Sequence, residues 1–308
     1  MTNAFIITVD TEGDNLWRWK KGAPITTENA KFIPRFQELC EKFGCKPVYL
    51  TNYEMAQDDA WVHYIKPKAQ QGLCEIGMHI HAWNSPPEYK LKDFFGGNPY
   101  ITEYPDEVAE EKIKYLTHFL ESRFETKIVS ARSGRWATND AYFDALKRNG
   151  YGVDCSLTPD IDWSANPGAT VRCGNDYRNV KRKVFLHSSG IVEVPMTSKK
   201  VRHWAEGTVR HKVASITKGD KLWLRPFKKS LHDLIFLSEN VAKEENGYLE
   251  FMIHSSELMP GGSPYFKSEE EIDLLYMIMR QYFGWVSEND YEGVSLSDYV
   301  DDWNKKNV

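Results

Sequence analysis

Short apolar runs alternate with amphipathic helical patterns along almost the whole chain. Phe5-Ile-Ile-Thr-Val9 is a run of the kind that forms a strand buried on both faces. Further strands are predicted at residues 47–51, 74–81, 127–131, 152–154, 191–194 and 248–254. Helices are predicted at 28–43, 60–71, 106–124, 138–149, 231–245, 268–282 and 295–305. Repeated strand–helix units predict an α/β fold with a parallel sheet, and six or seven of them favour a barrel over an open sheet.

Two segments interrupt this rhythm. A loop at 85–105 is rich in proline and glycine and long enough to predict a functional role. A basic stretch follows the fifth predicted strand, and we expect an insertion there at about 155–230 within a single domain spanning 1–308. Between residues 171 and 229 the chain has 15 Lys and Arg against 4 Asp and Glu. The segment therefore carries a net charge of +11 in a chain of net charge −5, which leaves −16 for the remainder.

This charge asymmetry has two interpretations. One face of the protein meets an anion, or the insertion is a solvated basic surface with no specific ligand. Nucleic acid is disfavoured as the anion, because no recognised nucleic-acid motif accompanies the basic residues.

The cysteines and the N-terminus predict a compartment. Five cysteines are scattered singly, an odd number without a Cys-x-x-Cys pair, which argues against a disulfide framework and fits a reducing environment. The first ten residues lack the basic region and long apolar run of a signal peptide, and no stretch approaches the length of a transmembrane helix. We therefore expect a cytoplasmic protein with no integral membrane segment.

Titratable residues gather where the predicted strands end. His79 and His81 are two residues apart on one strand, so both imidazoles point to the same face and can converge on a metal ion. The pair alone fits packed, hydrogen-bonded histidines equally well. Other predicted strands end in carboxylates, arginines or a third histidine, at Asp10, Glu12, Asp14, Arg132, Arg135, Asp154, His254 and Glu257. Parallel strands place all these ends on one rim, where such a set favours metal-assisted hydrolysis over chance.

The order of these motifs resembles the polysaccharide deacetylases of the NodB-homology type, carbohydrate esterase family 4. The matching segments are Thr8-Val-Asp10-Thr-Glu12, Glu75-Ile-Gly-Met-His79, Arg132-Ser-Gly-Arg-Trp136, Asp154 and Met252-Ile-His254. They span roughly residues 4 to 284. The run from His254 to Tyr265 is similar to a subgroup met in bacterial surface-glycan (O-antigen type, lipopolysaccharide) clusters.

The resemblance implies a distorted (β/α)7 barrel, with the basic insertion after its fifth strand, and a role for each matched residue. Asp10 would be the catalytic base, tethered by Arg132, and His254 the acid that protonates the departing amine. Glu12 and His79 would hold a divalent metal, most often zinc. We expect Trp83, Trp136, Arg135 and Glu257 to contact the substrate.

Three features depart from the family pattern. The family has adjacent aspartates in its first motif, whereas a threonine separates Asp10 from Glu12, so Asp14 is an alternative ligand to Glu12. The family spaces its two histidines four apart, but Trp83 stands at that position, which leaves His81 as the candidate second ligand. Gly134 stands where the arginine motif usually has proline.

Three functional hypotheses follow. The first is a metal-dependent hydrolase that removes an N-acetyl (or O-acyl) group from a sugar of a bacterial surface polysaccharide or its precursor. That precursor would be either nucleotide-linked or carried on a lipid diphosphate, and the basic segment would suit such an anionic carrier. The alternatives are an amide hydrolase of a small nitrogen metabolite and a non-catalytic glycan-binding relative. Tryptophans 17, 19, 83, 136 and 204 mildly favour a sugar, because aromatic rings stack on apolar sugar faces.

Overall fold

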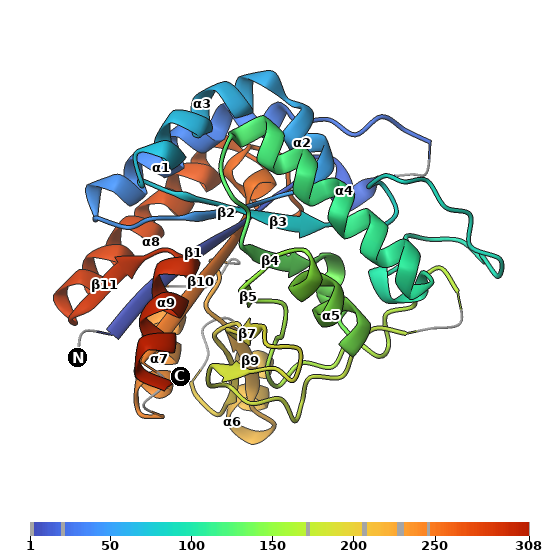
Figure 1. Cartoon of the computed structure of the whole chain (residues 1–308). Helices are drawn as coiled ribbons and strands as arrows, with labels where there is room; N and C mark the ends of the chain where they lie inside the picture. The colour runs from blue at the N-terminus through green and yellow to red at the C-terminus, as the bar shows by residue number, and fades with distance from the viewer. Residues whose placement is uncertain are drawn as a thin grey trace.

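The computed structural model describes residues 3–19, 22–170, 173–204, 208–226, 231–244 and 247–307. A parallel sheet curls through it in the order β10–β1–β2–β3–β4–β5–β7, with helices on its outer face (Figure 1). These strands are β1 (Asn3–Thr11), β2 (Val48–Thr51), β3 (Glu75–Ile80), β4 (Ser130–Ser133), β5 (Val153–Asp154), β7 (Val192–Glu193) and β10 (Tyr248–His254). The predicted distorted barrel is thereby confirmed.

The curled sheet forms a half-barrel, and in the described part of the chain no strand ladder joins its first strand, β10, to β7. Between β7 and β10 the backbone N–H of Leu224 donates to the carbonyl of Thr197 at 2.9 Å, and that of Met252 donates to the carbonyl of Leu224 at 3.0 Å. β11 (Tyr291–Val294) pairs with the first half of β1. β1 therefore has hydrogen-bonded strands along both of its edges, whereas, among the described residues, only single backbone hydrogen bonds connect the region between β7 and β10.

Most helices cover the outside of the sheet. Their bounds are α1 (Ile33–Lys42), α2 (Tyr53–Gln57), α3 (Asp59–Gln70), α4 (Asp106–Phe124), α5 (Asp140–Arg148), α7 (Leu231–Ala242) and α8 (Glu269–Glu288). The last helix, α9 (Leu296–Asn307), packs instead against the side chains inside the barrel. The predicted helix 28–43 is split into a 3₁₀ turn at Glu28–Phe32 and α1, because Pro34 is tolerated only in a first turn. The end predicted at residue 245 for α7 lies outside the described residues.

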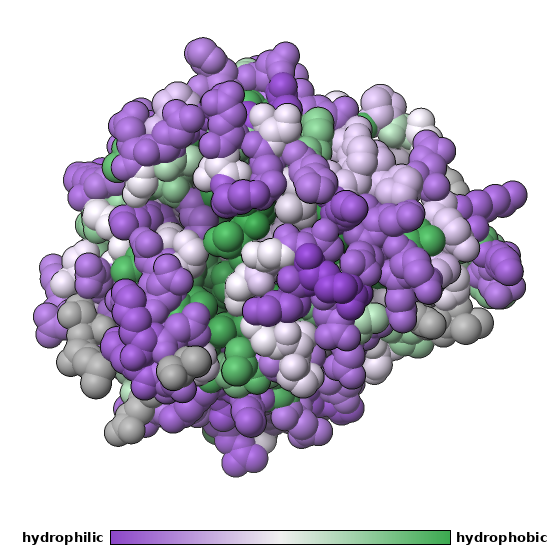
Figure 2. Space-filling view, viewed as in Figure 1, coloured by the Kyte–Doolittle hydropathy of each residue, from purple (hydrophilic) through white to green (hydrophobic). Residues whose placement is uncertain are grey.

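Side chains of β1 alternate between two apolar regions. Phe5 and Val9 pack outward against the helices, whereas Ala4 and Ile6 point into the barrel, where α9 contributes Leu296. Because both faces of β1 are buried, its sequence is an almost continuous apolar run. The face in Figure 2 is mostly hydrophilic, and hydrophobic side chains gather in a band near its centre.

The segment predicted as an insertion is partly barrel. It contains β7, paired in parallel with β5 and antiparallel with β6 (Phe185–Leu186). It also contains a hairpin of β8 (Ser198–Val201) and β9 (Asp220–Trp223) joined by α6 (Val209–Thr217). The predicted boundary at 230 lies outside the described residues. Within the described residues, no helix is long and apolar enough to cross a membrane.

Candidate metal centre and catalytic cavity

The carboxyl ends of the barrel strands surround a cavity of about 490 Å³. Its lining includes five of the six residues that we call the strand-end group: Asp10, Glu12, His79, His81, Arg132 and His254. The sixth, Arg132, lies fully buried behind Asp10. Strand pairing brings these residues together, since Asp10 is in register with His254 and His79 with Arg132.

Glu12, His79 and His81 form a group that could hold a metal ion, and their candidate ligand atoms all lie within 4.8 Å of one another. Glu12 Oε2 is 3.4 Å from His79 Nε2 and 3.2 Å from His81 Nε2. Ligand atoms placed tetrahedrally around zinc, at bonds of roughly 2.0–2.1 Å, are about 3.3 Å apart. The spacing therefore fits a zinc-sized ion, with two nitrogen ligands and one oxygen ligand.

The two histidines differ in their surroundings. His79 Nδ1 lies 3.2 Å from the carbonyl of Arg132, to which it donates, so that Nε2 is left with its lone pair toward Glu12. His81 stacks on Trp83, with ring centroids 5.5 Å apart. Burial lowers the pKa of His81 to about 4, which keeps the ring neutral as a ligand must be. Burial alone would lower the pKa of His79, but the negative charges of Asp10 and Glu12 outweigh burial, and the net effect is a raised pKa. The surroundings of His79 therefore favour a positive charge at this position.

Two of the departures from the family pattern touch each other. A Cβ atom placed on Gly134 would lie 2.2 Å from His81 Cδ2 and 2.6 Å from the carbonyl oxygen of Ile80. Any side chain at position 134 would therefore displace His81. The glycine in the arginine motif provides the space in which the second histidine lies.

Asp10 is held by Arg132 inside the barrel. Arg132 Nη1 donates to Asp10 Oδ1 at 2.7 Å, while Nη2 donates to Thr8 Oγ1 at 2.9 Å and to Glu250 Oε1. Burial raises the pKa of Asp10, but the charges of Arg132, His79 and His254 outweigh it and hold the pKa well below its ordinary range. Glu250, which sequence reasoning missed, has a pKa raised by burial to about 7. Asp10 is thus an oriented, ionised carboxylate.

His254 faces Asp10 and Glu12 across the cavity, with its Nε2 at 3.8 Å from Asp10 Oδ2 and 3.7 Å from Glu12 Oε1. Arg225 Nη2 lies 2.7 Å from the other ring nitrogen, Nδ1. Glu257 Oε2 lies 3.3 Å from the same nitrogen, so Nδ1 stands between a guanidinium that can only donate and a carboxylate that can only accept. Arg225 and Glu257 together hold the ring with its other nitrogen, Nε2, facing the cavity.

Glu257 lies behind His254 rather than on the cavity wall where we expected a substrate contact. It is fully buried and accepts from the His254 backbone N–H at 2.8 Å and from Arg225 Nη2 at 3.0 Å. Burial raises its pKa, but the charge of Arg225 and the hydrogen bond with His254 outweigh it and lower the pKa to about 2. Its position is that of a counter-charge to Arg225 and His254.

Asp14 lies outside the metal group. Its carboxylate accepts from Thr26 Oγ1 at 2.5 Å and from the backbone N–H of Asn29 at 3.3 Å, which anchors the loop after β1. Asp154 also points away from the cavity, since it accepts from Tyr142 Oη of α5 at 2.8 Å on the helix-covered side of the sheet. Glu12 is therefore the carboxylate that the structure brings to the histidines.

Arg135 and Trp136 line the cavity, as expected for substrate contacts. Their backbones adopt positive φ angles of 57° and 62°, a left-handed conformation that is uncommon for two successive non-glycine residues. Arg135 Nη2 donates to Tyr100 Oη at 3.0 Å and to the carbonyl of Pro167 at 2.9 Å. Arg135, which follows β4, is thus hydrogen-bonded to the segment that follows β5.

Four further residues line the cavity and were missed by sequence reasoning, and we call them the cavity wall: Trp163, Asn166, Trp223 and Arg225. Trp223 contacts both Trp136 and Trp163 edge to face, with centroids 5.6 and 5.9 Å apart. All four wall residues come from the segment predicted as an insertion. The aromatic residues of this segment were the available signal, but no periodicity in the sequence places them.

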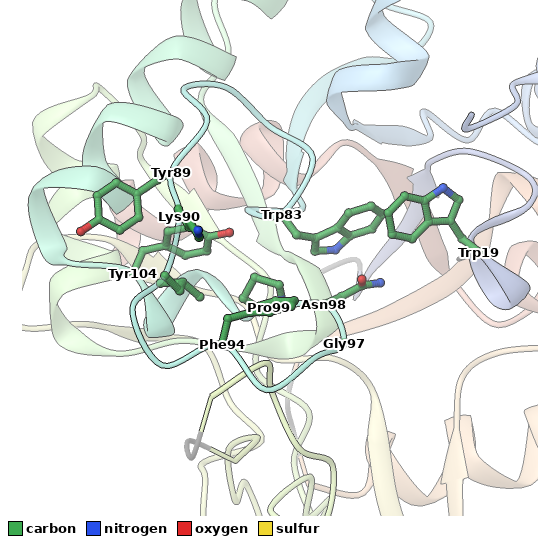
Figure 3. A pocket seen from close by; sticks show the side chains of 10 residues that line it. Trp19, Trp83, Tyr89, Lys90, Phe94, Gly97, Asn98, Pro99 and Tyr104 are labelled. Atoms are coloured by element: carbon green, nitrogen blue, oxygen red, sulfur yellow. The ribbon is translucent and has the colours of Figure 1, made fainter. Parts of the chain in front are cut away.

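A second, smaller cavity of about 170 Å³ adjoins the first and shares Trp83 and Asn98 with it. Figure 3 shows Trp19 and Trp83 on one side and Phe94, Pro99 and Tyr104 around the other. Trp19 and Trp83 are in ring contact, 4.6 Å apart. Lys112 secures the loop that forms this cavity by donating to the carbonyl of Ser85 at 2.6 Å. The predicted functional loop at 85–105 therefore lines a cavity beside the candidate metal group.

Comparisons with known proteins give a fold. No protein-family model matches the sequence, and no curated protein matches it. Among solved structures, a protein from Mycobacterium smegmatis assigned as a polysaccharide deacetylase superposes with a TM-score of 0.58 at 13% identity, over 100% of this chain and 93% of that one. A GH57 branching enzyme from Thermococcus kodakaraensis superposes with a TM-score of 0.57 at 11% identity, over 98% of this chain and 71% of that one.

A 4-alpha-glucanotransferase from Thermococcus litoralis has a TM-score of 0.54 at 11% identity, over 98% of this chain and 40% of that one. These proteins share a barrel and carry out different reactions, so the fold does not choose among them. The chemistry of this chain has to be argued from its own cavity.

Proposed function

We propose that this protein is a metal-dependent hydrolase that removes an N-acetyl (or O-acyl) group from a sugar of a bacterial surface polysaccharide or its precursor. The observation that carries the proposal is the Glu12–His79–His81 group, placed in one cavity with an oriented carboxylate, Asp10, and a third histidine, His254. Ligands, base and acid are the parts that metal-assisted hydrolysis requires.

Glu12, His79 and His81 would hold the divalent ion, with zinc favoured by the two imidazole ligands and the ligand spacing. Held there, the ion would act as a Lewis acid toward the acyl carbonyl. Asp10 takes the proton of the attacking water, and Arg132 keeps the carboxylate ionised and oriented. His254, in its protonated form, gives the Nε2 proton to the departing amine, and Arg225 and Glu257 hold its ring in position.

The pKa values of Asp10 and Glu12 argue against cleavage of a glycosidic bond, the type of reaction named for the glucanotransferase and the branching enzyme. A glycosidase needs one protonated acid with a raised pKa beside an ionised carboxylate. In this cavity the charges of neighbouring histidines and Arg132 outweigh burial and lower the pKa of both Asp10 and Glu12. Neither carboxyl group is therefore available as a proton donor at neutral pH.

The aromatic surroundings support a sugar over a small nitrogen metabolite. Trp17, Trp83, Trp136, Trp163 and Trp223 line the main cavity, and the smaller one adds a further group of aromatic rings. Flat rings stack on apolar sugar faces, and Asn98 and Arg135 offer hydrogen-bond donors between them. The adjoining cavity has room for a neighbouring ring of the same glycan or for the carrier of a linked precursor.

The test is acetate release from N-acetylated oligosaccharides and from nucleotide- and lipid-linked N-acetyl sugars. Metal-stripped protein should be inactive and should regain activity with zinc. Asp10→Asn, which retains the candidate ligands, serves as the matched inactive control. Absence of release from every substrate by protein that has bound one equivalent of metal would refute the proposal and favour a glycan-binding function.

A further inference from the structure

Helix α6 exposes the apolar side chains that an ordinary amphipathic helix would bury. Val209, Val213 and Ile216 are 77%, 55% and 42% exposed, and their i, i+4, i+7 spacing places them on one face. On the inward side, Ser215 is buried and donates to the carbonyl of His203 at 2.8 Å. The helix is thus attached to the protein by its polar side and presents its apolar side outward.

Trp204 extends this apolar face. It is 64% exposed, and the ammonium group of Lys212 lies 5.6 Å from the centroid of its ring. Tryptophan with a neighbouring lysine is typical of the membrane–water interface, where an amphipathic ring lies among headgroups. We call the four residues Trp204, Val209, Val213 and Ile216 the α6 patch.

Basic residues surround the α6 patch. Residues 198–221 contain seven Lys and Arg against two Asp and Glu. Among them Lys200, Arg202, Arg210, Lys218 and Lys221 are exposed. An apolar stripe with lysine and arginine at its margins matches a surface of acyl chains beneath anionic headgroups.

A second exposed apolar pair shows that the charge is specific to α6. Leu274 and Met277 on α8 are 51% and 49% exposed, but Glu270, Glu271 and Asp273 precede them in the first turns of the same helix. Anionic lipid would repel this acidic surface. The two helices therefore present similar apolar exposure with opposite charge.

We propose that the α6 patch docks on the surface of an anionic lipid bilayer. Nine residues are far too few to span a membrane, which takes about 20, but suffice to lie in the interface. The location of α6 at the lower edge in Figure 1 leaves it accessible to a planar surface. The proposal depends on α6 and its charges and stands whatever reaction the cavity performs.

The β8–β9 hairpin connects the α6 patch to the cavity wall. Val201 pairs with Asp220 next to α6, and Ser198 pairs with Trp223 at the wall. A three-residue step along a strand covers about 10 Å. Docking through α6 would therefore bring the cavity close to the headgroups, where a sugar attached to a lipid carrier is presented.

The experiment is sedimentation of the full-length protein with vesicles of phosphatidylcholine alone or mixed with phosphatidylglycerol. The parent should bind the mixed vesicles at least about tenfold more tightly than the neutral ones, and added salt should weaken that binding. Val213→Glu/Ile216→Glu should reduce binding at least about tenfold. The matched control, Leu274→Glu/Met277→Glu, should leave it unchanged.

A second variant, Lys218→Glu/Lys221→Glu, keeps the apolar residues and should also weaken binding to the mixed vesicles. Circular dichroism and thermal melting establish that each variant is folded. No binding of the parent to phosphatidylglycerol vesicles would overturn the proposal, as would an equal loss in the α8 control. Sedimentation velocity gives a third overturning result: a dimer that Val213→Glu/Ile216→Glu abolishes would identify a second copy as the occupant.

Discussion

The strand-end group and the cavity wall border the same cavity but are built in different ways. Backbone pairing of regular parallel strands fixes the first, as the register of Asp10 with His254 shows. Side-chain contacts hold the second, such as the edge-to-face contact between Trp163 and Trp223. The difference separates two tasks, because the sheet positions the reacting groups while the irregular segment positions the acid and surrounds the substrate.

The point of contact between the two regions is the pair His254 and Arg225. His254 belongs to the sheet, but Arg225 from the wall contacts its ring at Nδ1. If the division of tasks is correct, changes in the strand-end group should affect metal binding or bond cleavage. Changes in the wall should alter proton donation and substrate selection with the metal retained.

The largest effect should come from Asp10→Asn. The amide keeps the shape of the side chain but cannot take a proton, so turnover should fall by about 10³-fold. Metal content, measured by atomic absorption, should stay at the parent level, whereas His79→Ala should lose the metal as well as the activity. An Asp10→Asn enzyme that keeps a tenth of its activity would rule out the assigned base.

Glu54 allows a stability test close to the strand-end group. Burial, together with the charge of Glu12, raises its pKa to about 7 from an ordinary 4.5. The folded protein therefore holds this proton more tightly than the unfolded chain, and the associated stability is lost as pH rises from about 4.5 through 7. The loss amounts to at most about 3 kcal/mol.

Glu54→Gln removes this titration. Urea unfolding of metal-free protein at pH 5, 6 and 7.5 should show the free energy of unfolding falling less steeply in the variant than in the parent. Parallel curves for the two proteins would mean that Glu54 is ionised in the fold at all three values. Glu250, whose pKa burial also raises to about 7, titrates in the same window in both proteins, so the difference between their two slopes is the measure of Glu54.

Gly134→Ala tests whether His81 is a ligand. The new methyl group would lie 2.2 Å from the imidazole and should weaken zinc binding by about 10- to 100-fold, as measured by competition with a chelator. Gly152→Ala is the matched control, because a Cβ at Gly152 meets nothing within 4 Å. Equal zinc affinity in both variants would leave Glu12 and His79 as the ligands and remove His81 from the centre.

The barrel and the strand-end group could be predicted because both follow from periodicity. Apolar runs locate the strands, and parallel strands place their carboxyl ends on one rim. The i, i+2 spacing that aligned His79 with His81 is confirmed by their shared proximity to Glu12 Oε2. For these residues, the positions along the chain were sufficient to predict that they lie close together.

The remainder depends on contacts that periodicity does not encode. β4 spans Ser130–Ser133, whereas the apolar run predicted 127–131. The strand continues through Arg132 and Ser133 because hydrogen bonds within the barrel satisfy the polar groups of these two residues. The end of α8 at Glu288, beyond the predicted 282, reflects continued packing of Phe283 and Val286. Arg225 is one of the fifteen Lys and Arg residues between 171 and 229, and nothing in the sequence separates it from the others. Its contact with His254 is visible in the structure.

The smallest effect should come from Arg225→Gln, which keeps a donor toward His254 and removes the positive charge. Turnover should fall by about tenfold, and zinc affinity should be unchanged. A loss of zinc in Arg225→Gln would show instead that the wall supports the metal centre, and that the two regions are one.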